Sequence, residues 1–109
     1  MLLPIILPTF LPISTKMIKV NEYFNGKVKS LSLVTPEGPA TAGVMQAGEY
    51  CFGTNCVEIM KINAGILTVQ LPGEKFWIDF TEGQEFEVPA NVKFNVKCSA
   101  DVAYVCCYR

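Results

Sequence analysis

The 109 residues suffice for one domain with a modest hydrophobic core and leave no room for a separate catalytic lobe. Half of the residues are hydrophobic and only 17% are charged, which is typical of a compact globular chain and argues against disorder. The formal net charge of −1 provides no broad basic surface, so neither nucleic acid nor an anionic membrane is an expected partner.

An apolar segment with regularly spaced prolines occupies residues 1–16. Pro4, Pro8 and Pro12 prevent a regular helix, and the segment is too short to span a bilayer. It also lacks the basic region and the cleavage site of a secretory signal. We therefore expect a dispensable extension at 1–16 and one domain at 17–109. The rival interpretation is an arm that packs on a partner chain through Ile5, Ile6, Leu7 and Phe10.

Short strands separated by turn signals are predicted from residue 21 onward. Apolar residues recur at every second position, as half-buried strands require, in runs at 67–71, 76–80 and 92–96. Turns rich in glycine and proline are predicted around these runs at 36–39, 46–48, 63–65, 72–73 and 81–83. No window has the apolar stripe of an amphipathic helix. Eight or nine short strands at this spacing predict an all-β sandwich or barrel.

The cysteine content favours free thiols over a disulfide framework. The five cysteines are an odd number and include no Cys-x-x-Cys pair, which is typical of a protein in a reducing compartment. We interpret them as small apolar fillers of strands rather than as reactive groups. Cys106 and Cys107 are adjacent, so their side chains should point to opposite faces of a strand.

The spacing of glycines and one proline narrows the fold further. Gly48 and Gly65 enclose a segment that resembles the first cupin motif, and Gly83 with Pro89 resembles the second. In metal-binding cupins these motifs supply histidines and a glutamate, whereas this chain has no histidine. One thiol and one carboxylate do not make a three-ligand zinc or iron site. We expect a cupin-type double-stranded β-helix, or jelly-roll barrel, without metal or cofactor. The ligand positions are occupied by Thr54, Cys56, Glu58 and Phe94.

Longer strings carry a closer resemblance. They lie at 21–24 (NEYF), 26–30 (GKVKS), 43–45 (GVM), 48–50 (GEY) with Phe52, 58–60 (EIM) and 103–108 (AYVCCY). Together they resemble the small bacterial pyrimidine/purine nucleoside phosphorylases, which are metal-free cupins, over roughly residues 17–109. The resemblance implies phosphorolysis, in which a nucleoside and inorganic phosphate give free base and pentose 1-phosphate, for purines and pyrimidines alike. It also implies a cytoplasmic homodimer whose small-molecule partners are nucleosides and phosphate.

Glu58 is the candidate catalytic residue. Cupins present this position to the cavity, where a carboxylate accepts from two adjacent ribose hydroxyls and steadies positive charge at C1′. The alternative is an outward-facing strand glutamate. Aromatic side chains offer flat surfaces for any base, although core packing of a small barrel would also account for them. The candidate substrate-binding residues are Tyr50, Phe52, Thr54, Phe94 and Tyr104.

Phosphate requires cationic or N–H-rich surroundings. The candidates are Lys27, Lys29, Lys61 and Arg109, with backbone amides at the Gly53–Thr54 turn. The alternative for each lysine is a solvated strand face. Some relatives carry arginine where this chain has Pro39 and Cys107. If those arginines hold phosphate, Arg109 or a lysine must replace them here.

Two other function classes remain open from the sequence. A cupin without metal can be a non-catalytic barrel that binds a small nucleoside- or sugar-like ligand. The chain can also be an interaction module whose segment 1–16 recruits a partner. Phosphate-dependent release of free base from nucleosides distinguishes the enzyme from both.

Overall fold

The computed structural model describes residues 17–109, so the predicted extension at 1–16 and its rival role as a partner-binding arm lie outside the described residues. Ten strands form in the described range, against the eight or nine expected, and the all-β prediction is confirmed. Within 17–109 no helix is long and apolar enough to cross a membrane.

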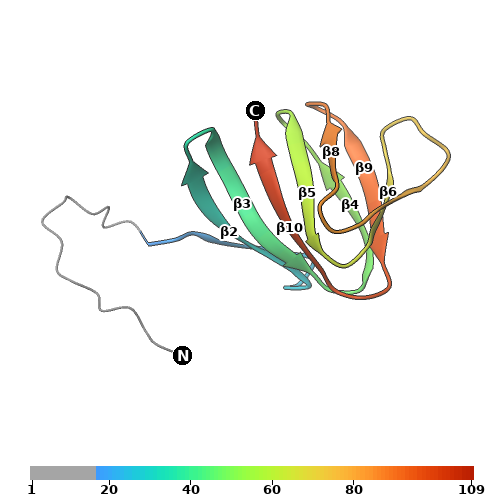
Figure 1. The fold of residues 1–109 in the computed structure, drawn as a ribbon, viewed down its shortest axis with the longest axis horizontal. Helices are drawn as coiled ribbons and strands as arrows, with labels where there is room; N and C mark the ends of the chain where they lie inside the picture. The colour runs from blue at the N-terminus through green and yellow to red at the C-terminus, as the bar shows by residue number, and fades with distance from the viewer. Residues whose placement is uncertain (1–16) are drawn as a thin grey trace, which may run out of the picture.

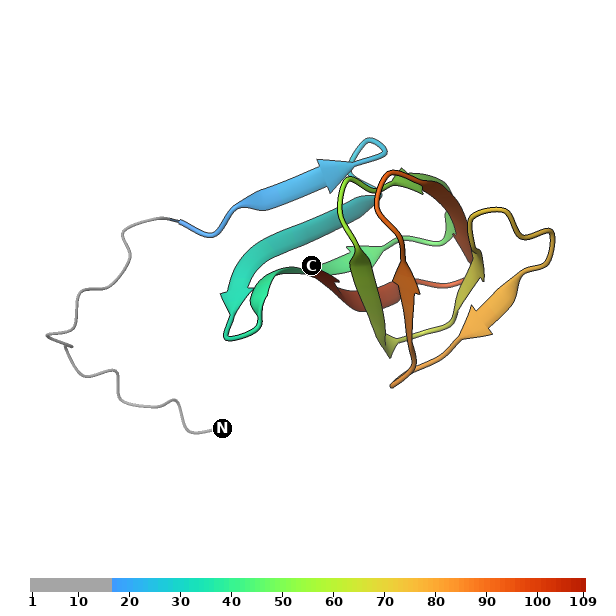
Figure 2. The same ribbon diagram turned by 90° about the horizontal axis from the view of Figure 1, so that it is seen from above.

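Two antiparallel sheets pack against each other to form the barrel (Figures 1 and 2). The six-stranded sheet has the order β1 (Val20–Tyr23), β2 (Val28–Thr35), β3 (Gly38–Met45), β10 (Val102–Tyr108), β5 (Glu58–Ala64) and β8 (Glu85–Val88). The four-stranded sheet has the order β4 (Gly48–Gly53), β9 (Lys93–Cys98), β6 (Leu67–Gln70) and β7 (Ile78–Phe80).

The core lies between the sheets because every second side chain of each strand points inward. In β10 the inward set is Val102, Tyr104 and Cys106, and each is at most 7% exposed. The predicted alternation also holds in β6 and β9, where Leu67, Val69, Phe94 and Val96 are buried. Hydrophobic burial of these side chains against the facing sheet stabilises the fold.

The predicted strand at 76–80 is only partly correct. β7 begins at Ile78, and Phe76 lies before it with 58% of its surface exposed. Trp77 does not enter the core either; its ring lies 4.2 Å from the ammonium of Lys97, in a cation–π contact on the surface. The run therefore has a strand pattern, but only its last residues pair with β6.

The turn between β1 and β2 was not predicted from the sequence. Phe24, Asn25 and Gly26 all have positive φ, at 53°, 57° and 83°. Two consecutive left-handed residues suit the twist of a tight hairpin, but this conformation is costly for a bulky phenylalanine. The ring of Phe24 compensates by packing on Tyr50, at 4.9 Å between centroids, and on Phe52, at 5.4 Å.

Gly43 allows Tyr104 to lie flat on β3. These two residues are paired across β3 and β10. A Cβ at position 43 would lie 2.6 Å from the ring carbon Cζ and the hydroxyl of Tyr104, and 2.9 Å from the carbonyl oxygen of Lys29. Since no side chain fits there, glycine is required by close approach and not by its φ angle.

Gly43→Ala is expected to lower the free energy of unfolding by about 1–3 kcal/mol, the usual cost of overpacking a core. Thermal unfolding followed by circular dichroism measures the loss. Gly53→Ala is the matched control, since its added Cβ would meet nothing nearer than 3.9 Å. Equal melting temperatures for the two variants would contradict the close approach of Tyr104.

Candidate active site

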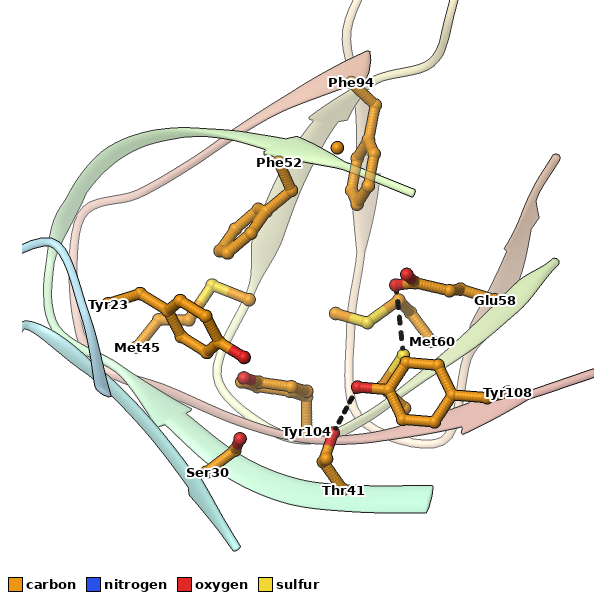
Figure 3. A pocket seen from close by; sticks show the side chains of 12 residues that line it. Tyr23, Ser30, Thr41, Met45, Phe52, Glu58, Met60, Phe94, Tyr104 and Tyr108 are labelled. Atoms are coloured by element: carbon orange, nitrogen blue, oxygen red, sulfur yellow. Dashed lines mark hydrogen bonds between the residues drawn. The ribbon is translucent and has the colours of Figure 1, made fainter. Parts of the chain in front are cut away.

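A cavity of about 120 Å³ lies between the two sheets (Figure 3). Its lining includes side chains from strands of both sheets and from the edge strand β1, which contributes Tyr23. The two sides of the cavity differ in chemistry. The strands of the four-stranded sheet contribute aromatic rings, and the six-stranded sheet contributes hydroxyls, a thiol and one carboxyl group.

The apolar side is built by Phe52 of β4 and Phe94 of β9, which are paired across the two strands. Their ring centroids are 5.9 Å apart with an interplanar angle of 31°. Met45 of β3 and Met60 of β5 add apolar thioethers to the cavity wall from the six-stranded sheet. Flat rings and flexible thioethers accept planar ligands of different outline, so this side suits a heterocyclic base.

The polar side carries hydroxyl groups from three neighbouring strands, β2, β3 and β10. Thr41 and Tyr108 share a hydrogen bond of 3.0 Å between their hydroxyl oxygens. Burial raises the pKa of Tyr104 to about 12, although the nearby Ser30 hydroxyl partly opposes that rise. These groups therefore remain protonated at neutral pH and can both donate to and accept from the hydroxyls of a sugar.

Glu58 begins β5 and is the one carboxylate on the cavity wall. Its Oε1 accepts a hydrogen bond from the thiol of Cys106 at 3.3 Å. Burial raises the pKa of the Glu58 carboxyl, and the Cys106 hydrogen bond partly opposes that rise. Among residues 17–109 the ion pair found joins Lys29 to Glu22, and no cation pairs with Glu58. A half-buried carboxylate without a counter-charge is suited to stabilise positive charge on a ligand.

The structure brings four of the predicted residues together around the cavity, and these are Glu58, Phe52, Phe94 and Tyr104. Tyr50, another predicted substrate-binding residue, is buried beside the cavity. Its hydroxyl donates to the carbonyl oxygen of Gln46 at 2.6 Å.

Thr54 does not line the cavity, contrary to its assignment from the cupin motif. Its hydroxyl donates to the carbonyl oxygen of Pro89 at 2.6 Å and accepts from the amide of Val92 at 3.2 Å. Its own amide donates to the carbonyl oxygen of Val92 at 2.9 Å. The predicted phosphate-binding amide at the Gly53–Thr54 turn is therefore already used to hold two loops together.

The proposed cations lie outside the cavity. Lys27, Lys29 and Lys61 are all exposed, and Lys29 pairs with Glu22 at 3.4 Å on the outer face of the six-stranded sheet. Arg109 is also exposed, but it follows Tyr108, whose side chain lines the cavity, and its guanidinium donates to the Tyr108 carbonyl oxygen at 3.1 Å.

The guanidinium of Arg109 lies beside the turn that precedes Pro39, where Nη1 would be 3.8 Å from a Cβ on Gly38. Position 107 is the other position at which some relatives carry arginine. Cys107 lies between Cys106 and Tyr108, whose side chains point inward, so it belongs to the outer face of the sheet.

Sequence reasoning assigned no site role to several residues that line the cavity. Tyr23 stood out only as part of a family string, and Cys106 was interpreted as an apolar filler. Cys106 is indeed buried, at 2% exposure, but it also contacts Glu58. The only sequence signal for these residues is the alternation that turns their side chains toward the core. The local sequence does not say which strands pair or in which register. The residues missed are Tyr23, Ser30, Thr41, Met45, Met60, Cys106 and Tyr108.

Metal-binding groups do not gather in the described range. Within residues 17–109 no group of three or more cysteine, aspartate, glutamate or histidine side chains is placed to hold an ion. Cys56, which occupies a cupin ligand position, does not line the cavity with Glu58. The donor set at the cavity is thus one carboxylate and one buried thiol, which does not fit a zinc or iron centre.

Comparisons with known proteins match this chain over most of its length. A family model described as pyrimidine/purine nucleoside phosphorylase matches residues 18–108. A relative of that name from Pseudomonas fluorescens strain Pf0-1 is 57% identical over 93 residues, which cover 85% of this chain and 99% of the relative. Another from Pseudomonas aeruginosa strain PAO1 is 56% identical, over 85% of this chain and 100% of the relative.

The chain belongs to the pyrimidine/purine nucleoside phosphorylase family. Solved structures agree with this family's fold. A Vibrio parahaemolyticus protein of unknown function is 38% identical with a TM-score of 0.80, over 84% of this chain and 97% of that one. A cupin of the RmlC-like type from Shewanella frigidimarina is 17% identical with a TM-score of 0.63, over 86% and 85% of the two chains. The predicted cupin-type barrel is confirmed.

In this member of the phosphorylase family, Glu58→Gln is expected to raise thermal stability at neutral pH. Burial lifts the pKa of the carboxyl above its ordinary value of 4.5, so ionisation costs folding free energy once the pH exceeds that value. The gain should shrink as the pH falls and disappear below 4.5, where the carboxyl is protonated in both states.

Melting temperatures measured from acid to neutral pH test this expectation. Glu87→Gln, at an exposed position of the neighbouring strand β8, is the matched control. A Glu58→Gln protein that is no more stable than wild type at pH about 7 would show that the carboxylate is fully hydrated.

Proposed function

We propose that this protein is a metal-independent phosphorylase of broad specificity that converts purine and pyrimidine nucleosides and phosphate to free base and pentose 1-phosphate. The observation that carries the proposal is Glu58, a half-buried carboxylate that pairs with no cation of residues 17–109 and is set between an aromatic surface and a row of hydroxyls. The names of the relatives support the same reaction.

The two sides of the cavity suggest how a nucleoside binds. The base stacks on Phe52 and Phe94, which make no hydrogen bonds and so do not distinguish purines from pyrimidines. The ribose lies against Glu58 and the hydroxyls of Thr41, Tyr104 and Tyr108. Because these groups can both donate and accept, the contacts fix the orientation of the sugar.

The reaction breaks the bond from C1′ to the base nitrogen and forms a bond from C1′ to a phosphate oxygen. The electron pair of the broken bond leaves with the base, which takes up the proton that phosphate loses. Positive charge develops on the ribose ring in the transition state, and the Glu58 carboxylate stabilises it. Phosphate is already a nucleophile, so the step requires no metal and no covalent intermediate with the protein.

A nucleoside needs more room than the cavity offers. Its volume of about 120 Å³ is below the roughly 300 Å³ at the lower end of ligand pockets. Tyr23 lies on the edge strand β1 and is half exposed, so it can move without breaking core contacts. Binding therefore requires Tyr23 to move aside at the edge of the six-stranded sheet (Figure 3).

The purified protein should release free base from both a purine and a pyrimidine nucleoside, only when phosphate is present and equally well in EDTA. Glu58→Ala should lower the rate about a hundredfold, since loss of an interaction made in the transition state costs ~3 kcal/mol. Chromatography of base and pentose 1-phosphate measures both. Nucleoside binding by calorimetry without any release of base would instead identify a non-catalytic binding barrel, and loss of activity in EDTA would refute metal independence.

Arg109 is the cation that we propose for phosphate, because its guanidinium donates to the carbonyl oxygen of Tyr108, whose side chain lines the cavity, whereas Lys29 is paired with Glu22 on the outer face. Arg109→Ala should raise the KM for phosphate about tenfold while the KM for nucleoside changes little. Lys29→Ala is the matched control, since Lys29 is paired with Glu22 on the outer face. A larger effect of Lys29→Ala than of Arg109→Ala would overturn this assignment.

We further propose a cytoplasmic homodimer. All five cysteines are free thiols, which supports a reducing compartment. The outer face of the six-stranded sheet carries exposed apolar side chains: Leu31 and Val44 are 46% and 51% exposed, and Ala42 is paired with Leu31 on one side and Val105 on the other. A patch of this kind on a small domain favours burial against a second copy through a two-fold axis.

Light scattering is expected to show a dimer at micromolar concentration, also for a protein that starts at Met17. Leu31→Asp should give a monomer, because it places an unpaired charge in the contact. Val34→Asp, an exposed residue on the other face of the same strand, should leave the dimer intact. A monomeric Met17-start protein would contradict the proposal.

A further inference from the structure

Two separate hydrogen bonds lie on the polar wall around strand β10, and one of them holds Glu58. Cys106 of β10 donates to Glu58 Oε1 at 3.3 Å, and Tyr108, two residues further along the same strand, shares a 3.0 Å bond with Thr41 of β3. Tyr108 is paired directly with Glu58 across β10 and β5, and Cys106 is paired with Thr41 across β10 and β3. Figure 3 shows both hydrogen bonds facing the cavity.

The Cys106 hydrogen bond makes the two oxygens of Glu58 unequal. Oε1 accepts from the thiol, whereas Oε2 has no hydrogen-bond donor among the described residues. Cys106 is 2% exposed, so water does not compete for the thiol. A carboxylate held by one oxygen presents the other in a fixed direction, and a thiol is a weak donor that leaves most of the negative charge in place.

We propose that Cys106 is a positioning residue that holds Oε1 of Glu58 and thereby aims Oε2 at the ribose ring in the cavity. The inference rests on the proposed phosphorolysis and deepens it. Cys106 forms no bond with substrate and is not oxidised. Its role requires the donating Sγ–H group and not merely a side chain of suitable volume.

A packing role and a positioning role differ in what they do to the ionisation of Glu58. The hydrogen bond from Cys106 favours the charged carboxylate, so its loss should move the pKa of Glu58 further upward. Among residues 17–109 the other titratable groups on the cavity wall are Tyr23, Tyr104, Tyr108 and the Cys106 thiol itself, and no lysine, arginine or second carboxylate of this range lines it. Phosphate also titrates, so the part of the acidic limb that moves when Cys106 is replaced is what reports Glu58, which must lose its proton to stabilise the ribose.

Cys106→Ala and Cys106→Ser separate the two roles. Alanine removes the donor, and serine keeps one. Cys106→Ala should lower kcat about fivefold, as expected for one lost hydrogen bond, with the KM for phosphate unchanged, and should move the acidic limb to higher pH. Cys106→Ser should restore both kcat and the limb toward wild type.

Cys98→Ala is the matched control. Cys98 is also a buried thiol, 8% exposed, and it donates to a protein oxygen, the carbonyl of Gln46, at 3.5 Å. It does not line the cavity, so its loss should leave kcat and the acidic limb unchanged. Equal kcat and pH profiles for Cys106→Ala and wild type, or a Cys106→Ser protein no better than Cys106→Ala, would overturn the proposal.

A measurement without turnover keeps this inference separate from the enzyme assignment. Carbon-13 NMR of the Glu58 carboxyl gives its pKa in wild type, Cys106→Ser and Cys98→Ala, and in Cys106→Ala if that protein folds. Wild type and Cys98→Ala should titrate together, Cys106→Ser with them or at lower pH because a hydroxyl is the stronger donor, and Cys106→Ala at higher pH. If no protein releases base but this order holds, phosphorolysis fails and the Cys106 contact stands. If Cys106→Ser titrates as high as Cys106→Ala, or if Cys106→Ala titrates with wild type, the contact itself is refuted.

Discussion

Strand β10 is hydrogen-bonded to β3 on one side and to β5 on the other, and the polar wall of the cavity depends on that double pairing. Its inward residues bring a thiol and two phenolic hydroxyls between the Thr41 of one neighbour and the Glu58 of the other. The register is fixed because a slip by one residue would expose Cys106 and Tyr104 and bury Val105. The site is therefore formed by the same pairing that closes the core.

Charge is the second feature that shapes the site. The cavity wall has one carboxylate and no cation in the described part of the chain, although the proposed second substrate is an anion. Phosphate and Glu58 would repel each other across a small space, and water is the only screen. In the proposed reaction the developing positive charge of the ribose lies between the two anions and offsets their repulsion.

The sequence was sufficient for the fold because alternation and turn chemistry are local. The inward phase of Leu67, Val69, Phe94 and Val96 followed directly from their spacing. Thr54 was misassigned because a motif position does not reveal which loop its hydroxyl binds. The hydroxyls of Ser30 and Thr41 and the thiol of Cys106 could not be placed, since their meeting depends on the pairing of strands far apart in the chain.

The aromatic contact of Phe24 has a mechanical consequence. β1 and β4 are the edges of their sheets and share no backbone ladder, so the rings of Phe24, Tyr50 and Phe52 bridge the two sheets at this seam. Opening the seam breaks ring contacts worth about 0.5–1.5 kcal/mol each and relaxes the left-handed backbone at residue 24. Parting two paired strands would instead break a row of amide hydrogen bonds, so this seam opens more easily than a backbone ladder does.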